Sequence, residues 1–158
     1  MDIAATQGQA SGLTSARVHP GSTRIAFVLL AAGALAMGFL ATDADTNARA
    51  LAEAGPELTM LLRAMAGLKA GLAAFVTAVI VWRLGSPASP QRLIAYGVAV
   101  VLMMASPGLI WTLAHVGLGA AMLHGGLLMA ILLLWRDQVI GERLGRIIIA
   151  RRTALRRG

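Results

Sequence analysis

The chain has 158 residues, enough for one compact unit, and 58% of them are hydrophobic while only 13% are charged. Soluble domains carry about a quarter charged residues, so this composition excludes a water-soluble globular protein and predicts an all-α polytopic membrane protein. Cysteine is absent, which excludes disulfides, thiolate nucleophiles, iron–sulfur clusters and cysteine zinc sites.

The net charge of +7 does not indicate a nucleic-acid partner. The basic residues cluster at the ends of apolar runs, which is the pattern that sets membrane topology. Three Phe, three Trp and one Tyr are too few to form a surface on which bases stack.

The chain begins with a polar segment, residues 1–23, which is predicted to be a flexible cytoplasmic tail. The first apolar run, about 25–41, is long enough to span a bilayer. A cleaved signal peptide is the alternative interpretation. The long segment before Arg24 and the bulky Phe39 and Leu40 near the end of the run favour an uncleaved anchor.

The next segment, residues 42–56, is net negative and is predicted to be an acidic periplasmic loop. Pro56 and Glu57 suit the first turn of a second helix, expected over about 57–83. Proline needs no amide partner in a first turn, and a carboxylate there faces the positive end of the helix dipole.

The third and fourth apolar runs, about 92–113 and 118–136, are separated by only a few residues. This short connection predicts a tight antiparallel hairpin that completes a four-helix transmembrane bundle over residues 24–136. Pro107 has no amide hydrogen to donate to the carbonyl of Met103, which predicts a kink in the third helix.

The C-terminal segment, residues 137–158, is rich in arginine, with Ile and Leu at helical spacing on one face. A basic amphipathic helix on an anionic leaflet fits this pattern, with lipid headgroups or a partner contacted by Arg143, Arg146, Arg151 and Arg152. A plain topology anchor explains the same arginines equally well.

The charge of the connections predicts that both termini are cytoplasmic. Basic residues lie at both chain ends and around the 84–92 turn, whereas residues 42–56 are acidic and the 114–117 turn is uncharged. Every connection therefore agrees with the positive-inside rule. The high content of Ala, Gly and Arg is typical of GC-rich bacterial genomes, so a bacterial inner membrane is expected.

Two pairs of small residues are predicted to pack helices together. Gly67 and Gly71 form a G-x-x-x-G pair in the second helix, and Ala121 and Gly125 form a similar pair in the fourth. Small residues let backbones approach closely where lipid provides no hydrophobic drive for association.

Ionisable residues inside the spans are the strongest functional signal, because hydrocarbon penalises them. Counted from Trp82 and Trp135, Lys69 and His124 lie about 20 and 16 Å deep at a rise of ~1.5 Å per residue. The predicted polar layer, which would contact a ligand or a partner, comprises Lys69, Ser106 and His124, with Arg63, Thr112 and His115 nearer the periplasmic surface.

Each of these residues also has a purely structural interpretation. Lys69 could extend its charge to the interface, His124 could hydrogen-bond a neighbouring helix, and Pro107 is tolerated in spanning helices. No Asp or Glu lies within a span. A buried lysine would therefore need a counter-charge from a partner subunit or an anionic cofactor.

The favoured function is that of a non-catalytic accessory or assembly subunit of a larger bacterial inner-membrane complex, because the chain is small and has no reaction motif. One alternative is a redox protein that binds haem or another pigment through His124. The other is a small transporter or Cu(I)-handling protein that uses methionines with His115 and His124. No enzyme activity, metal site or other cofactor is predicted.

Overall fold

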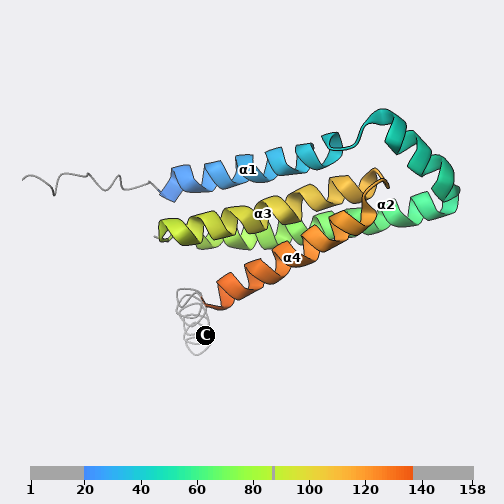
Figure 1. The fold of residues 1–158 in the computed structure, drawn as a ribbon. Helices are drawn as coiled ribbons and strands as arrows, with labels where there is room; N and C mark the ends of the chain where they lie inside the picture. Colours follow the sequence, from blue (N-terminus) through green and yellow to red (C-terminus); the bar gives the residue numbers. More distant parts are fainter. Residues whose placement is uncertain (1–19, 87, 137–158) are drawn as a thin grey trace, which may run out of the picture.

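The computed structural model describes residues 20–86 and 88–136, and every regular element in these ranges is an α-helix. The four helices run alternately in opposite directions and are α1 (Pro20–Leu40), α2 (Ala44–Arg83), α3 (Pro90–Trp111) and α4 (Val116–Trp135) (Figure 1). All four are long and apolar enough to cross a membrane. The predicted all-helical fold with four candidate spans is confirmed.

Both predicted tails lie largely outside the described residues. Of the segment 1–23, only the last residues are described, and they already belong to α1, which begins at Pro20. Proline suits a helix start because the first amide has no partner in the helix. The C-terminal segment 137–158, with Arg143, Arg146, Arg151 and Arg152, lies outside the described residues.

The two ends of the molecule differ in charge. One end, here the basic end, carries Arg24, Arg83, Arg92 and Arg136 at the start of α1, the end of α2, the start of α3 and just after α4. The opposite end, here the acidic end, carries Asp43, Asp45, Glu53 and Glu57. The alternating helix directions therefore separate the charges that the sequence places in successive connections.

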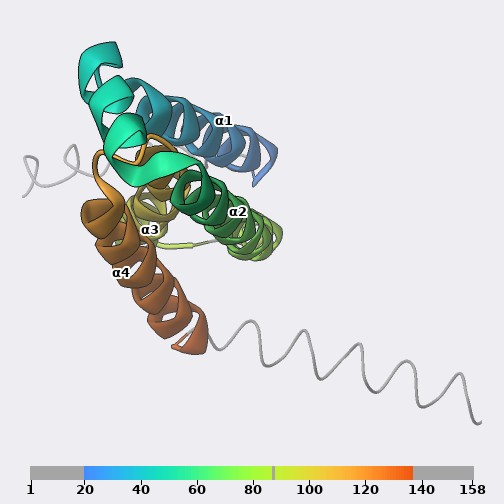
Figure 2. The same cartoon turned by 90° about the vertical axis from the view of Figure 1, so that its right-hand side faces the viewer.

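The central helix is α3. In its most apolar stretch 61% of the residues are buried, against 22% in each of the other helices. It packs against α1, α2 and α4, whereas α1 hardly touches α2. Figures 1 and 2 show α1 and α4 on opposite sides of the α2–α3 pair. Tyr96, Ala99, Val100 and Met103 of α3 are fully buried in this core.

The expected acidic loop is largely helical, which corrects the prediction for residues 42–56. Asp43 caps the first turn of α2, because its carboxylate accepts hydrogen bonds from the Thr46 amide at 2.8 Å and the Thr46 hydroxyl at 2.7 Å. The residues after the cap are mostly Ala, Leu, Arg and Glu, which favour helix. Their net negative charge indicated solvent exposure but did not prevent helix formation.

A glycine divides α2 into a short segment and a long apolar segment. Gly55 has φ 72° and ψ 171°, a conformation that L side chains rarely adopt, and Pro56 follows it. Figure 1 shows the chain reversing at this break. Residues 56–83 then extend about 42 Å at ~1.5 Å per residue, more than the ~30 Å of a bilayer core.

The connection between α3 and α4 is a tight hairpin, as its sequence predicts. α3 continues through the buried Pro107 to Trp111, and α4 begins at Val116. Leu113 in the turn has φ 62°, which is uncommon for a residue other than glycine. This turn places the first half of α4 directly against the second half of α3.

Candidate functional site

Lys69 and Ser106 lie on the packed faces of their helices. Lys69 is half-buried and shares one face of α2 with Ala66, Ala73 and Val76. Ser106 is fully buried, and its hydroxyl has no hydrogen-bond partner among the described residues. An unpaired buried hydroxyl is unfavourable in an apolar interior, so Ser106 is a polar group held inside the bundle at a cost.

His124 does not join them, which corrects the predicted internal layer. It lies on the exposed face of α4, and its Nδ1 is 2.7 Å from the carbonyl oxygen of Ala120 in the preceding turn. A carbonyl only accepts, so Nδ1 carries the proton, and Nε2 of the neutral ring is left as an acceptor. The face of α4 that meets the core is instead formed by Gly119, Leu123, Gly126 and Ala130.

The other predicted polar residues lie near the acidic end. His115 is exposed in the turn before α4, where its carbonyl accepts from the Gly119 amide at 2.9 Å. Arg63 is half-buried on α2. The residues of the predicted layer therefore lie in three places. Lys69 and Ser106 are on packed helix faces, His124 is on the outer face of α4, and Arg63 and His115 are near the acidic end.

The predicted packing glycines face outward, which differs from the expectation. A Cβ added to Gly67, Gly71 or Gly125 would meet no atom within 4 Å, and Ala121 is exposed. The helix contacts are made by other small residues. α4 is apolar on every side, so its sequence alone does not distinguish the packed face from the outer one.

The α3–α4 contact depends on Gly119 and Gly126. A Cβ on Gly119 would lie 2.7 Å from Cγ1 of Ile110 and 3.0 Å from the Ser106 carbonyl oxygen. A Cβ on Gly126 would lie 2.8 Å from Cγ of Met103. These two glycines, seven residues apart, let the helix backbones approach closely.

The α1–α3 contact depends on a second pair, Gly38 and Gly108. A Cβ on Gly38 would overlap the Ala105 carbonyl, and a Cβ on Gly108 would overlap the backbone of Gly38 and Phe39. Here the obstacle is backbone rather than a flexible side chain. Glycine is therefore required at this crossing.

Aromatic and cationic side chains join three helices near the acidic end. The guanidinium carbon of Arg63 lies 5.2 Å from the ring centroid of Trp111, within the range of cation–π attraction. The Trp111 ring meets the Phe39 ring edge to face, with centroids 6.3 Å apart and planes at 69°. Among the described residues, the buried Nε of Arg63 has no hydrogen-bond partner. The guanidinium group is instead attracted to the face of the Trp111 ring.

Two threonines form hydrogen bonds at the acidic end of the α1–α3 pair. The Thr112 hydroxyl donates to the Leu109 carbonyl at 3.0 Å and lies 3.1 Å from the Thr42 hydroxyl. Because each hydroxyl has one proton, Thr42 donates to Thr112. This chain of bonds ties the end of α1 to the end of α3.

At the basic end, arginines differ sharply in exposure. Arg83 is only 1% exposed and donates to the Ser86 carbonyl at 3.4 Å, whereas Arg24 is exposed and donates to the Trp82 carbonyl at 3.4 Å. The Arg24 guanidinium also lies over Gly85, where an added Cβ would overlap it. Gly85 therefore leaves room for the Arg24 charge beside the end of α2.

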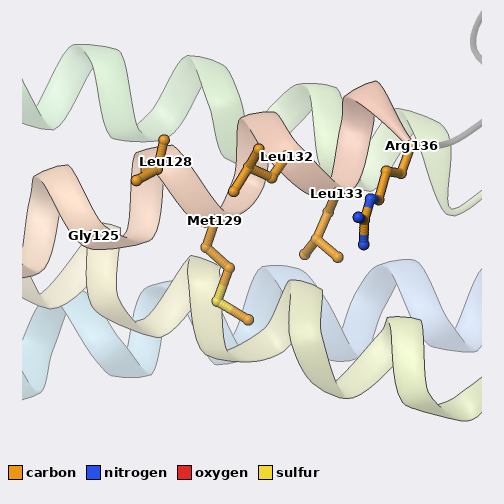
Figure 3. Close-up of a pocket in the computed structure, with 6 residues that line it drawn as sticks. All are labelled: Gly125, Leu128, Met129, Leu132, Leu133 and Arg136. Carbon is orange, nitrogen blue, oxygen red and sulfur yellow. The ribbon is translucent and has the colours of Figure 1, made fainter.

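A shallow hollow of about 440 Å³ follows the second half of α4 and ends at Arg136. Figure 3 shows that its lining residues belong to α4 and, for Arg136, to the residue that follows it, with Met129 pointing toward the α3 ribbon. The other lining residues are Gly125, Leu128, Leu132 and Leu133. In Figure 1 this half of α4 diverges from α3, which leaves the hollow open.

The methionines suggested for a copper site differ in exposure. Among the described residues, no group of three or more His, Asp or Glu side chains could hold a metal ion. Met60 and Met65 lie at the surface, Met103 is buried against Gly126, and Met104 and Met122 are half-buried. The methionines thus occupy different environments, as expected of side chains that fill gaps between helices.

Several residues that make contacts between helices were not predicted from the sequence. Trp111 ends an apolar run, a frequent position for tryptophan, but nothing in the sequence pairs it with Arg63. The seven-residue spacing of Gly119 and Gly126 was a usable signal for a packed face, whereas Gly38 and Gly108 carry no spacing signal.

Comparison of the chain with protein-family models, with curated proteins and with solved structures finds no match.

Proposed function

We propose that the protein is a non-catalytic accessory or assembly subunit of a larger bacterial inner-membrane complex, bioenergetic complexes included. The observation that carries this proposal is an exposed face of small residues on the spanning part of α2. This face, the α2 docking face, consists of Ala64, Gly67 and Gly71.

The α2 docking face fits a partner helix better than lipid. Gly67 and Gly71 weaken helix formation relative to alanine and make no close contact within the described chain. In hydrocarbon, helices associate through close backbone approach, which glycine permits. A second helix seated here would use the surface that the glycines leave flat.

The charge distribution supports an orientation with both termini in the cytoplasm. The basic end gathers Arg24, Arg92 and Arg136 as exposed cations, and the acidic end presents Asp43, Asp45, Glu53 and Glu57. Under the positive-inside rule the basic end is cytoplasmic. The arginine-rich segment 137–158, with Arg143, Arg146, Arg151 and Arg152, would then meet anionic headgroups or an acidic partner on that side.

The test is extraction of the full-length protein from its own membranes in a mild detergent, followed by mass spectrometry of co-purifying chains. A stable set of membrane partners is expected with the natural sequence. Gly67→Leu with Gly71→Leu should remove that set while thermal unfolding of the subunit stays unchanged, because nothing within the described chain opposes the new side chains.

Gly33→Leu is the matched control, since Gly33 is an exposed spanning glycine on α1 with open space around it. It should leave the partners in place. A protein that purifies alone from native membranes, or one that keeps its partners in the Gly67 and Gly71 double variant, would contradict the docking proposal.

A second candidate function is binding of a haem or another tetrapyrrole pigment between α4 and a partner. It is favoured by the geometry of His124, whose Nδ1–H is held by Ala120 while Nε2 faces outward. A hydrogen bond from one ring nitrogen to a carbonyl fixes the orientation of an imidazole whose other nitrogen binds a metal. A visible absorption band in the gently purified assembly, lost with His124→Ala, would support it, and a colourless assembly would exclude it.

A further inference from the structure

A furrow runs between α1 and α2 in the half of the molecule nearer the basic end. It arises because α1 packs on α3 and hardly touches α2, so that α3 forms the floor of the gap. Its volume is about 490 Å³, within the ~300–1,000 Å³ of typical ligand sites. The lining residues are Arg24, Val28 and Ala31 of α1, Ala74, Thr77, Ala78, Val81 and Trp82 of α2, and Met104 of α3.

The furrow is apolar along its length and cationic at its mouth. Ala74 and Ala78 are small, exposed side chains, which keep the gap open toward the lipid side. From Ala74 to Trp82 the wall extends about 12 Å at ~1.5 Å per residue, close to the ~15 Å of hydrocarbon in one leaflet. Arg24 is the only charged residue among those that line it.

The position of Arg24 is defined by its neighbours. Its guanidinium donates to the Trp82 carbonyl at 3.4 Å and lies over Gly85, yet the side chain remains exposed. The half-exposed ring of Trp82 stands beside it, as amphipathic tryptophan rings do at the level of lipid headgroups. The charge therefore lies where an apolar channel meets the interfacial layer.

Thr77 adds a polar group to the wall. Its side chain is 7% exposed and its hydroxyl has no hydrogen-bond partner among the described residues. Thr77 lies about 7 Å deeper than Trp82 along the helix, at ~1.5 Å per residue. A hydroxyl at this depth lies among the acyl chains, below the ester carbonyls of a lipid, so it takes no part in headgroup recognition.

We infer that the furrow binds one anionic glycerophospholipid. An acyl chain lies along Ala74 and Ala78, and the phosphate pairs with Arg24. Basic pockets between spanning helices bind anionic headgroups in this manner. The inference goes beyond the proposed function, because none of the residues that line the furrow belongs to the α2 docking face.

The test is native mass spectrometry of the full-length protein equilibrated with an equimolar mixture of phosphatidylglycerol and phosphatidylcholine. The natural sequence should retain one phosphatidylglycerol per chain in preference to phosphatidylcholine. Arg24→Gln should lower that retention about fivefold, the order expected for one basic residue at a membrane surface. Ala78→Leu should lower retention of either lipid, because leucine fills the furrow.

Two matched controls separate this site from general surface charge. Arg92→Gln removes an exposed arginine of the basic end that does not line the furrow, and Ala36→Leu enlarges an exposed alanine of α1 outside it. Both should retain lipid like the natural sequence, and an unchanged thermal midpoint should accompany Arg24→Gln. Equal losses with Arg24→Gln and Arg92→Gln, or equal retention of the two lipids, would overturn the inference.

The furrow could instead hold a helix of another chain, and the same molecule offers a direct check. Because the sequence has no cysteine, Ala78→Cys introduces a single thiol into the wall. Efficient cross-linking of that thiol to another protein in native membranes would overturn the lipid assignment. Absence of such cross-links, together with the Arg24 effect, would support it.

Discussion

The guanidinium carbon of Arg63 lies 5.2 Å from the centroid of the Trp111 ring, so a cation of α2 is held on an aromatic face of α3. The Phe39 ring of α1 meets the Trp111 ring edge to face. Three helices are joined near the acidic end by one contact network. Its contribution to stability is measurable because each member can be removed separately.

Arg63 and Trp111 should be coupled by about 1 kcal/mol, the usual magnitude of a partly buried cation–π pair. Arg63→Gln, Trp111→Leu and the double variant form a cycle that isolates this term from the general effect of each substitution. Chemical unfolding of the full-length protein in detergent micelles provides the free energies. Strict additivity of the two single changes would show that the pair makes no specific contribution.

Adjacent glycines on α4 should respond oppositely to the same substitution. Gly126→Ala should destabilise the protein by about 1–3 kcal/mol, because the new methyl group presses on Met103 and forces α4 away from α3. Gly125→Ala should be neutral or slightly stabilising, because nothing lies within 4 Å of its Cβ position. Thermal unfolding midpoints compare the two variants directly. Similar midpoints would contradict the close approach of α4 to α3 at Gly126.

The α1–α3 crossing should tolerate substitution even less. Gly108→Ala places a methyl group against the backbone of Gly38 and Phe39, which cannot rotate away as a side chain can. We expect a larger loss than with Gly126→Ala, measured by the same unfolding midpoint and by the yield of folded protein. Gly33→Ala on the open face of α1 is the control and should unfold like the natural sequence.

The cap at Asp43 should make the start of α2 sensitive to acid. The amide and then the hydroxyl of Thr46 donate to the carboxylate and lower its pKa below the ordinary value of 3.8. A lowered folded pKa means that the stabilisation is complete above 3.8 and is lost as the pH falls through the lower folded value. The protection factor of the Thr46 amide, the exchange rate of the unfolded chain divided by that of the folded protein at the same pH, should fall over that range.

Substitution of the cap separates the hydrogen bond from other acid effects. Asp43→Asn keeps a capping oxygen, so the Thr46 amide should stay protected relative to the unfolded chain without the acid dependence. Asp43→Ala should leave the Thr46 amide unprotected at every pH. Equal protection of the Thr46 amide in the Ala variant and the natural protein would contradict the role of this cap.

Single introduced thiols should label from opposite sides of the membrane. Glu53→Cys lies at the acidic end and Gln91→Cys at the basic end, and both positions are exposed. In intact cells an impermeant maleimide should label the former, and the latter only after the membrane is opened. Labelling of both from one side would contradict the orientation proposed from charge.

Much of the fold was predictable because apolar runs and the short polar connections between them act locally in the chain. Apolar runs of about 17 residues or more are long enough to cross a bilayer core, where the backbone groups must be satisfied within a helix, so four candidate spans follow from the hydropathy pattern. Short connections make neighbours antiparallel, which brings together at one end Arg24, Arg83, Arg92 and Arg136. The error at residues 42–56 arose because acidic charge indicates exposure, not the backbone conformation that Asp43 and Gly55 specify.

The candidate site was less predictable, because the sequence does not reveal which face of an apolar helix packs. α4 is apolar on all sides, so Gly125 and Gly126 are equivalent by sequence, yet one is exposed and the other buried. His124 was expected inside the bundle and lies outside it for the same reason. Rotation of a helix about its axis changes every contact without changing its hydropathy.

The sequence by itself determined the all-helical architecture, the number of apolar spans and the separation of basic from acidic ends, since each depends on residues near one another in the chain. Only the tertiary structure decided that Arg83 is buried while Arg136, which also follows a tryptophan, is exposed. It also decided that Arg63 meets Trp111 and that α1 leaves a furrow beside α2. These features depend on how helices far apart in the chain are rotated and tilted against one another, which local preferences do not fix.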